Sequence, residues 1–173
     1  PAKCLFVAAS NPCACGWYAS QKKACSCSPS QREKYLGKLS GPLLDRIDLQ
    51  IWVDMPDSSL LENLPQISTE SKLPQIMLQV TKARQIQQKR LTSVGKNLNS
   101  QLGSADIRSI CQVDKSAWQL LRLAQHKIDL SLRGVFGVLR VAQTIADLES
   151  ANAITKTHVA EALQFRSLEK IRP

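Results

Sequence analysis

The run SGPLLDRID, residues 40–48, is the most informative stretch of the 173-residue chain. Its Gly-Pro pair predicts the end of the helix before it, and Leu-Leu followed by Asp-Arg predicts a short helical turn. That turn would hold the guanidinium of Arg46 in a fixed position. Two interpretations stay open: a weak surface pair with Asp45 or Asp48, or an arginine presented to a phosphate to neutralise charge during phosphoryl transfer.

The residues before this run combine strand, loop and helix signals. Residues 3–9 form a short apolar run, which predicts a strand buried on both faces inside a parallel sheet. Residues 12–28 lack periodicity and predict a loop, and Ser28-Pro29 predicts the start of a helix that continues to Gly41. Residues 48–54 alternate polar and apolar side chains and predict a second strand.

After residue 54 the β signal disappears. Three prolines and several serines mark residues 55–74 as a linker. Apolar residues between Ile76 and Leu91 then fall on one face of a long basic helix. Four shorter helices are predicted to begin at capping residues, namely Ser104, Asp114, Ser131 and Thr155. The expected fold is therefore mainly α: an α/β remnant over 1–54, the linker, and a helical bundle over 75–173.

Composition and charge limit the function classes. The chain has 23 Lys and Arg against 14 Asp and Glu, a net charge of +9. Residues 75–103 carry five cations and no acid, which fits either a solvated helix face or contact with phosphates or an acidic partner. No apolar run approaches the roughly 20 residues of a membrane helix, and the N-terminus lacks a convincing secretory signal. We expect a cytoplasmic protein without a membrane partner and, because an initiator Met is lacking, part of a longer chain.

Two cysteine pairs lie in the predicted loop, at Cys13 and Cys15 and at Cys25 and Cys27. Four thiolates brought together can hold a tetrahedral zinc ion, which would order a segment with almost no core. The spacing is C-x-C, tighter than the usual C-x-x-C, and disulfides or free thiols are the alternatives. Structural zinc is the favoured interpretation. The other two cysteines, Cys4 and Cys111, lie in apolar surroundings and are predicted to be core residues.

Three further polar residues have both a structural and a functional interpretation. Asn11 either begins an Asn-Pro turn or presents its amide at the end of a strand, where α/β folds bind ligands. Arg133 is predicted in the first turn of a helix, where its charge opposes the helix dipole, so a local reason such as a phosphate is expected. Arg140 follows two turns later on the same face.

With these runs, the chain resembles the magnesium chelatase-like AAA+ ATPases in their ComM (YifB) branch, which assists recombination of incoming DNA during natural transformation. The resemblance is carried by residues 7–16, 25–29, 39–49 and 139–148, in the order of the family and over nearly the whole chain. Ala14, where the family usually has proline, and Leu132 and Gly134, which are closer to the chelatase subunits, depart from the branch pattern.

The resemblance implies a role for each matching position. Asn11 matches sensor 1, which orients the water near the γ-phosphate, and Arg46 matches the arginine finger that acts in trans on a neighbouring subunit. Arg133 matches sensor 2 of the helical lid, with Arg140 as a possible substitute. The loop cysteines match the cysteine cluster of the family. ATP with Mg²⁺, a hexameric ring and DNA are the implied cofactors and partners.

The phosphate-binding parts of an ATPase are missing from the sequence. No G-x-x-x-x-G-K-[ST] motif occurs, and no apolar strand ends in the acidic pair that would hold Mg²⁺. We therefore expect the ATP-binding loop upstream of Pro1, and no tight ATP binding or hydrolysis by this polypeptide alone. Two alternatives stay open: a zinc-stabilised nucleic-acid-binding module that uses the 75–103 helix, and a chelatase-type motor subunit that acts on a protein partner.

Overall fold

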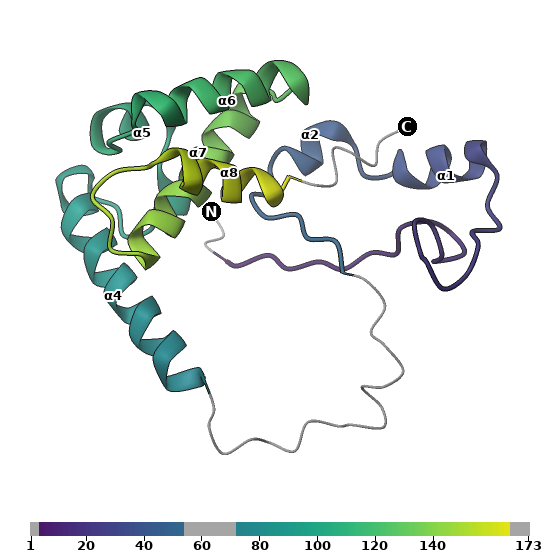
Figure 1. The fold of residues 1–173 in the computed structure, drawn as a ribbon, viewed down its shortest axis with the longest axis horizontal. Coiled ribbons are helices and arrows are strands. Elements are labelled where there is room, and N and C mark those ends of the chain that lie inside the picture. Colours follow the sequence, from purple (N-terminus) through teal and green to yellow (C-terminus); the bar gives the residue numbers. More distant parts are fainter. Residues whose placement is uncertain (1–3, 54–71, 167–173) are drawn as a thin grey trace. The chain divides into compact units, whose positions relative to one another are not determined.

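The computed structural model describes residues 4–53 and 72–166, which belong to two compact units. One unit extends to Gly41 and the other begins at Pro42. The first contains α1 (Pro29–Leu36), and α2 (Gly41–Leu44) begins the second. The remaining helices belong to the second unit: α4 (Leu73–Leu91), η1 (Thr92–Val94), η2 (Asn99–Gln101), α5 (Ser104–Ile110), α6 (Lys115–Lys127), α7 (Leu132–Leu148) and α8 (Lys156–Gln164) (Figure 1).

Helix α1 begins where the sequence predicts and ends earlier. The Ser28 hydroxyl accepts from the Gln31 backbone N–H at 3.2 Å, and the Gln31 side chain accepts from the Ser28 N–H at 2.9 Å. This reciprocal capping box satisfies two backbone donors that would otherwise have no partner. The helix stops at Gly37 instead of Gly41, because none of its residues is buried and no packing offsets the low helix propensity of glycine.

The predicted buried strand over residues 3–9 is wrong for the part that the structure describes. Residues 4–9 have no regular secondary structure, and Leu5 and Phe6 are 91% and 72% exposed. A buried strand needs neighbours for its backbone donors and acceptors, yet the described residues form only two isolated parallel bridges, Gln50 with Arg166 and Val113 with Ile154. Cys4, predicted to lie in the core, is exposed as well.

The second unit, called the helical unit below, is built around α7. This helix packs against α4, α5, α8 and η2 (Figure 1). Ten of the 17 residues of α7 are buried, so the helix is covered on several sides. Its Val138, Leu139 and Ala142 are at most 1% exposed and form the core with Leu121 of α6 and Val159 of α8. The bundle of five α-helices predicted from the sequence is confirmed over the described residues from 72 onward.

The ends of these helices follow the predicted caps closely. Ser131, Asp114 and Thr155 are the N-cap residues of α7, α6 and α8, and the Ser131 hydroxyl accepts from the Gly134 N–H at 3.0 Å. Helix α5 differs by one residue, because its N-cap is Gly103 and the first turn is closed by the Asp106 carboxylate, which accepts from the Gly103 N–H at 2.6 Å.

A buried carboxylate joins α4 to α7. Asp147 has no solvent exposure and receives two hydrogen bonds from the Arg90 guanidinium, at 2.6 and 2.7 Å. Its oxygens also accept from the side chains of Asn99 at 2.8 Å and Gln143 at 3.1 Å. Because each oxygen has two donors, the buried charge is paired and hydrogen-bonded as burial requires.

The segment around residue 46 belongs to the second unit and is attached to its later helices. The Gln50 N–H donates to the Phe165 carbonyl at 2.8 Å, its side-chain amide donates to the Leu44 carbonyl at 2.9 Å, and Arg140 pairs with Asp48 at 2.8 Å. Within its described part, residues 48–53, the second predicted strand is reduced to the single bridge at Gln50. Residues 54–71, which include most of the predicted linker, lie outside the described residues, and its last two residues, Leu73 and Pro74, already belong to α4.

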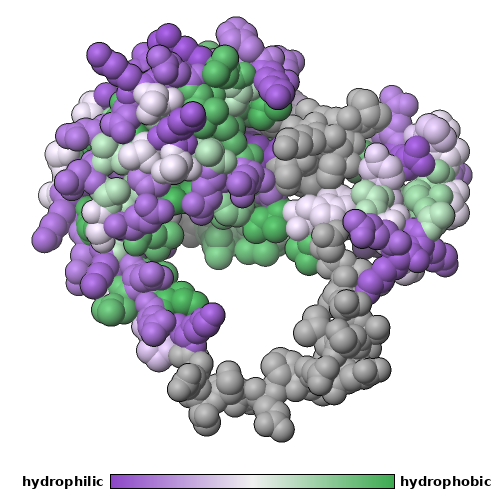
Figure 2. Space-filling view, in the orientation of Figure 1, coloured by the Kyte–Doolittle hydropathy of each residue, from purple (hydrophilic) through white to green (hydrophobic). Residues whose placement is uncertain are grey.

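Helix α4 extends beyond the core at its beginning. Its buried residues are Ala83, Gln87 and Leu91, all in its second half, whereas Ile76 and Met77 are 51% and 61% exposed. Figure 2 shows hydrophobic and hydrophilic side chains beside one another along this end of the helix. Within residues 4–53 and 72–166, no helix combines the length and the apolar character needed to cross a membrane.

Candidate functional site

The four loop cysteines come together in the first unit. The Sγ atoms of Cys13, Cys15 and Cys25 lie 3.4–3.7 Å apart, and all four, with Cys27, lie within 4.8 Å of one another. Four sulfurs at the usual Zn–S distance of about 2.3 Å from a tetrahedral zinc ion are separated by about 3.8 Å. The donor set and its spacing therefore fit a structural zinc site despite the C-x-C spacing.

Local turns and cation–ring contacts position this cysteine cluster. The Gly16 N–H donates to the Cys13 carbonyl at 3.1 Å, and Gly16 has a φ of 81°, which glycine adopts without strain. Arg32 of α1 donates to the Cys27 carbonyl at 2.8 Å and lies over the ring of Tyr18. The second cysteine pair is thus tied to the first turn of a capped helix.

Hydrogen bonds and burial shift the pKa values of two thiols of the cluster in opposite directions. A hydrogen bond with the Trp17 backbone lowers the pKa of Cys15 to about 5, against the opposing effect of partial burial. At Cys27 a hydrogen bond with the Cys15 backbone lowers the pKa, but side-chain contact with Cys15 and partial burial outweigh it and raise the pKa to about 11. Zinc binds thiolates, so a bound zinc ion would have to displace the proton of Cys27, whose pKa is raised, whereas Cys15, whose pKa is lowered, offers a thiolate more readily.

Cys111 behaves as the sequence predicts. It is half-buried against the hydrophobic core of the helical unit, and burial raises the pKa of its thiol to about 11. It has the character of a packing residue.

Arg46 follows α2 on a short turn and is exposed. The Arg46 and Ile47 N–H groups donate to the carbonyls of Leu43 and Leu44, both at 3.0 Å, which fixes the backbone. The guanidinium donates to the Pro42 carbonyl at 2.6 Å, and it forms no ion pair with any described residue. One N–H group of the guanidinium is bound to a carbonyl of its own turn. The remaining N–H groups can reach a ligand or another chain.

The two predicted sensor residues, Asn11 and Arg133, are also exposed and lie on different elements. Asn11 lies in the irregular segment of the first unit, and Arg133 lies in the first turn of α7 in the second. No hydrogen bond or ion pair among residues 42–53 and 72–166 links Arg46, Arg133 and Arg140 to one another. Their roles therefore remain predictions from the sequence.

Arg140 already has an internal partner. Its guanidinium donates to Asp48 Oδ1 at 2.8 Å and to the Leu102 carbonyl at 3.5 Å, and the side chain is 17% exposed. Asp48 belongs to the segment that carries Arg46, so this ion pair connects that segment to the middle of α7.

The sequence interpretation missed a buried arginine next to this pair. Arg166 is 1% exposed, donates to the Leu44 carbonyl at 3.5 Å, and has no partner for its Nε and Nη2 among the described residues. A Cβ at Gly137 would collide with Nη2 of Arg166, so only glycine leaves room for the guanidinium. The available signal was the spacing of Arg166 from Val159 and Ala162, which puts all three on the buried face of α8 or its extension.

Two consecutive parts of the chain match families of known proteins. Residues 1–61 match the family described as magnesium chelatase, subunit ChlI, and residues 70–166 match the family described as magnesium chelatase, subunit ChlI C-terminal. The chain therefore belongs to the magnesium chelatase ChlI family.

Individual relatives identify the branch of this family to which the chain belongs. Competence protein ComM of Haemophilus influenzae is 38% identical over 172 residues, 99% of this chain, and the uncharacterized protein YifB of Escherichia coli is 33% identical over 173 residues. Within the chelatase-like family, the chain lies in the branch of ComM and YifB. It spans about a third of the length of these relatives, 32% of each.

Proposed function

We propose that the chain supplies the nucleotide-sensing residues of an ATP-driven AAA+ ring motor. Residues 1–54 are the last part of the α/β core in this proposal, and 75–173 are the helical lid. Asn11 acts as sensor 1, Arg46 as the arginine finger in trans, and Arg133 as sensor 2, with Arg140 as its substitute. The family membership supports the motor class, because it extends over both parts of the chain.

The proposal rests on two properties of Arg46: its side chain is exposed, and its backbone is fixed by hydrogen bonds. An arginine finger has to reach a phosphate bound to a neighbouring subunit, so it needs an exposed guanidinium on a fixed backbone. Arg46 is exposed, its turn is closed by two backbone hydrogen bonds, and Gln50 and Asp48 attach the following residues to the helical unit. A planar fork of this kind neutralises phosphate charge better than an ammonium group.

ATP and Mg²⁺ are the cofactors of the assembled motor, which we propose to be hexameric and to work on DNA. The surplus of nine positive charges on the chain agrees with a polyanionic substrate. Without a glycine-rich phosphate loop the 173 residues neither bind ATP tightly nor hydrolyse it, and turnover by the pure polypeptide would contradict this. Structural zinc on the cysteine cluster is part of the proposal, supported by the sulfur spacing.

The test is an ATPase assay on a protein of the length of the relatives that carries these residues behind a phosphate-binding loop. Arg46→Ala should lower kcat by about 10³- to 10⁵-fold, the range that arginine fingers contribute. Arg46→Lys should restore little, because lysine lacks the bidentate fork. Lys127→Ala removes another exposed cation, at the end of α6, and should leave the rate unchanged.

Mixed rings separate action in trans from action in cis. An Arg46→Ala subunit keeps an intact ATP site, so mixing it with subunits that lack the phosphate-loop lysine should recover part of the activity. Arg133→Ala, which is proposed to act on nucleotide in its own subunit, should give no recovery in the same mixture. Recovery with neither variant, or with both, would refute the assignment of roles.

A further inference from the structure

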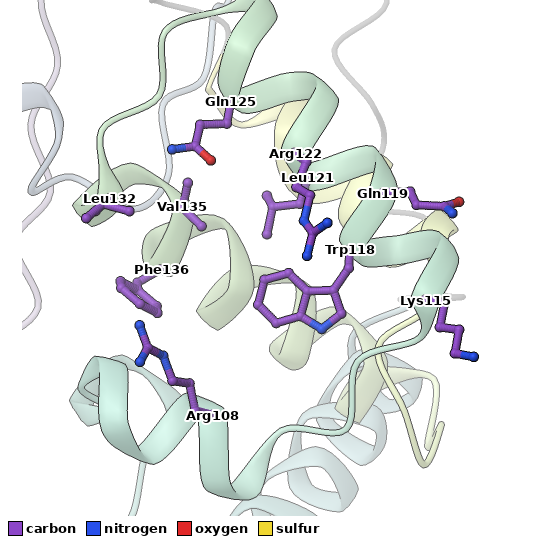
Figure 3. A pocket seen from close by; sticks show the side chains of 10 residues that line it. All are labelled: Arg108, Lys115, Trp118, Gln119, Leu121, Arg122, Gln125, Leu132, Val135 and Phe136. Carbon is purple, nitrogen blue, oxygen red and sulfur yellow. The ribbon is translucent and has the colours of Figure 1, made fainter.

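A hollow of about 520 Å³ lies between α5, α6 and α7, within the helical unit (Figure 3). Arg108 comes from α5, Trp118 and Arg122 from α6, and Phe136 from α7. Figure 3 shows both aromatic rings and both guanidinium groups directed into the space between the helices. The volume falls in the range of ligand-binding clefts, about 300–1,000 Å³.

The hollow has an unbalanced positive charge. Three cations line it, Arg108, Lys115 and Arg122, and its lining includes no Asp or Glu. None of the three forms an ion pair with another residue of 4–53 or 72–166. Arg108 lies over the ring of Phe136, 5.9 Å from the ring centroid. Figure 3 shows the Arg108 and Arg122 guanidinium groups directed toward the hollow and the Lys115 side chain directed away from it. Two converging guanidinium groups without a counter-charge complement an anionic occupant.

The aromatic rings set a second requirement for the occupant. Trp118 and Phe136 pack against the core with one part and remain half-buried, so both have surface at the wall of the hollow. An aromatic surface beside guanidinium groups suits a ligand that combines a flat ring with a negative charge. Nucleotides have this combination, with the base stacking on rings and the phosphate neutralised by arginine.

A neighbouring hollow extends the surface along α6. It is lined by Gln119, Arg122, Leu123 and His126 and shares the first two with the larger hollow. Leu123 is 68% exposed there, so an apolar surface again adjoins a cation. Two adjoining hollows along one helix suit an extended occupant better than a single mononucleotide.

We propose that this face of α6, with Arg108 and Phe136, binds a single-stranded nucleic acid. Bases stack on Trp118 and Phe136, and the backbone phosphates lie beside Arg108 and Arg122. This inference builds on the proposed function, since it assigns the DNA contact of the motor to the outer face of the helical unit. An acidic peptide would satisfy the cations and leave the two rings without a matching group.

The test measures binding of fluorescein-labelled dT20 to the 173-residue chain by anisotropy across a salt series. The double variant Arg108→Gln/Arg122→Gln should weaken binding and reduce the slope of log K against log salt by about 1.4, because each phosphate neutralised on a single strand adds about 0.7 to that slope. Trp118→Leu should weaken binding about 10-fold and leave the slope unchanged, because the variant removes stacking and keeps every charge.

The control removes two cations from the purely basic stretch. Lys82→Gln/Lys89→Gln changes the charge by the same amount on exposed positions of α4 and should leave most of the affinity. Equal decreases in affinity from the two double variants, or no binding of dT20 at low salt, would overturn the assignment. Displacement of dT20 by polyglutamate as effectively as by unlabelled dT20 would overturn it in favour of an acidic protein partner.

Folding and the proposed motor role are tested separately. The two arginines are exposed, so their double variant should keep the circular dichroism spectrum of the wild type even if Trp118→Leu disturbs the core. Arg46→Ala should bind dT20 like the wild type. Failure of the nucleic-acid assignment thus leaves the ATPase proposal intact, and failure of the mixed-ring assay leaves the nucleic-acid assignment intact.

Discussion

Asp147→Asn should destabilise the helical unit more than any other change of one carboxylate to an amide within its described residues. The Asp147 carboxylate is fully buried and accepts four hydrogen bonds, two of them from Arg90, whose side chain is only 20% exposed. Asparagine keeps the shape, removes the charge, and turns an NH₂ group toward donors. Removing one partner of a buried ion pair costs about 3–5 kcal/mol.

Urea unfolding followed by circular dichroism at 222 nm measures this destabilisation, because most helical residues belong to the helical unit. With a slope of about 2 kcal/mol per M, a decrease of about 3–5 kcal/mol lowers the midpoint by about 1.5–2.5 M. Asp129→Asn is the matched control, since Asp129 is exposed and its φ of 50° is tolerated by asparagine. If the two variants unfold at the same urea concentration, the ion pair does not hold α4 to α7.

Three further substitutions test other parts of the chain. Cys13→Ser should abolish binding of one zinc ion per chain in elemental analysis, because Cys13 is one of four converging thiols, whereas Cys111→Ser should keep it. Gly137→Ala should lower the free energy of unfolding by about 1–3 kcal/mol in urea, because the buried Arg166 guanidinium must move. A gain in stability, as helix propensity alone would give, would contradict that steric conflict. Ser131→Ala should cost about 1 kcal/mol in the same assay, since it removes the hydroxyl that caps α7.

The helix boundaries could be predicted because their determinants are local. Ser28 and Ser131 both accept a hydrogen bond from the third residue of the following helix, as a capping side chain does. The end of α1 at Gly37 was missed, because the sequence interpretation carried the helix on to a stronger stop signal at Gly41. A helix without buried residues ends at the first weak position.

The apolar run at residues 3–9 shows the opposite case. Its composition indicates a segment that could be buried between strands, but burial of a strand depends on neighbours that a local pattern does not contain. Among the described residues no strand pairs with it, and Leu5 and Phe6 are exposed. The same reason limits the segment after Asp48 to one bridge.

Long-range polar contacts were equally beyond sequence reasoning. Arg90 and Asp147 are 57 residues apart, and Arg166 and Leu44 are 122 apart. Arg90 reads in the sequence as one more cation of a basic stretch, although the fold uses it to neutralise a buried carboxylate. The apparent cationic surface is therefore smaller than the composition suggests.

We propose that the convergence of cations, and not their density along the chain, decides where this protein binds a polyanion. Of the five cations in residues 75–103, Arg90 pairs with Asp147 and Lys96 with Asp106. In contrast, Arg108 and Arg122 stand fourteen positions apart, on two helices, and meet at one hollow beside Trp118. A multivalent anion gains most from charges that act on it together and are not already neutralised. The comparison of the arginine pair with Lys82 and Lys89 is therefore a direct test of whether the fold or the local composition sets the proposed nucleic-acid surface.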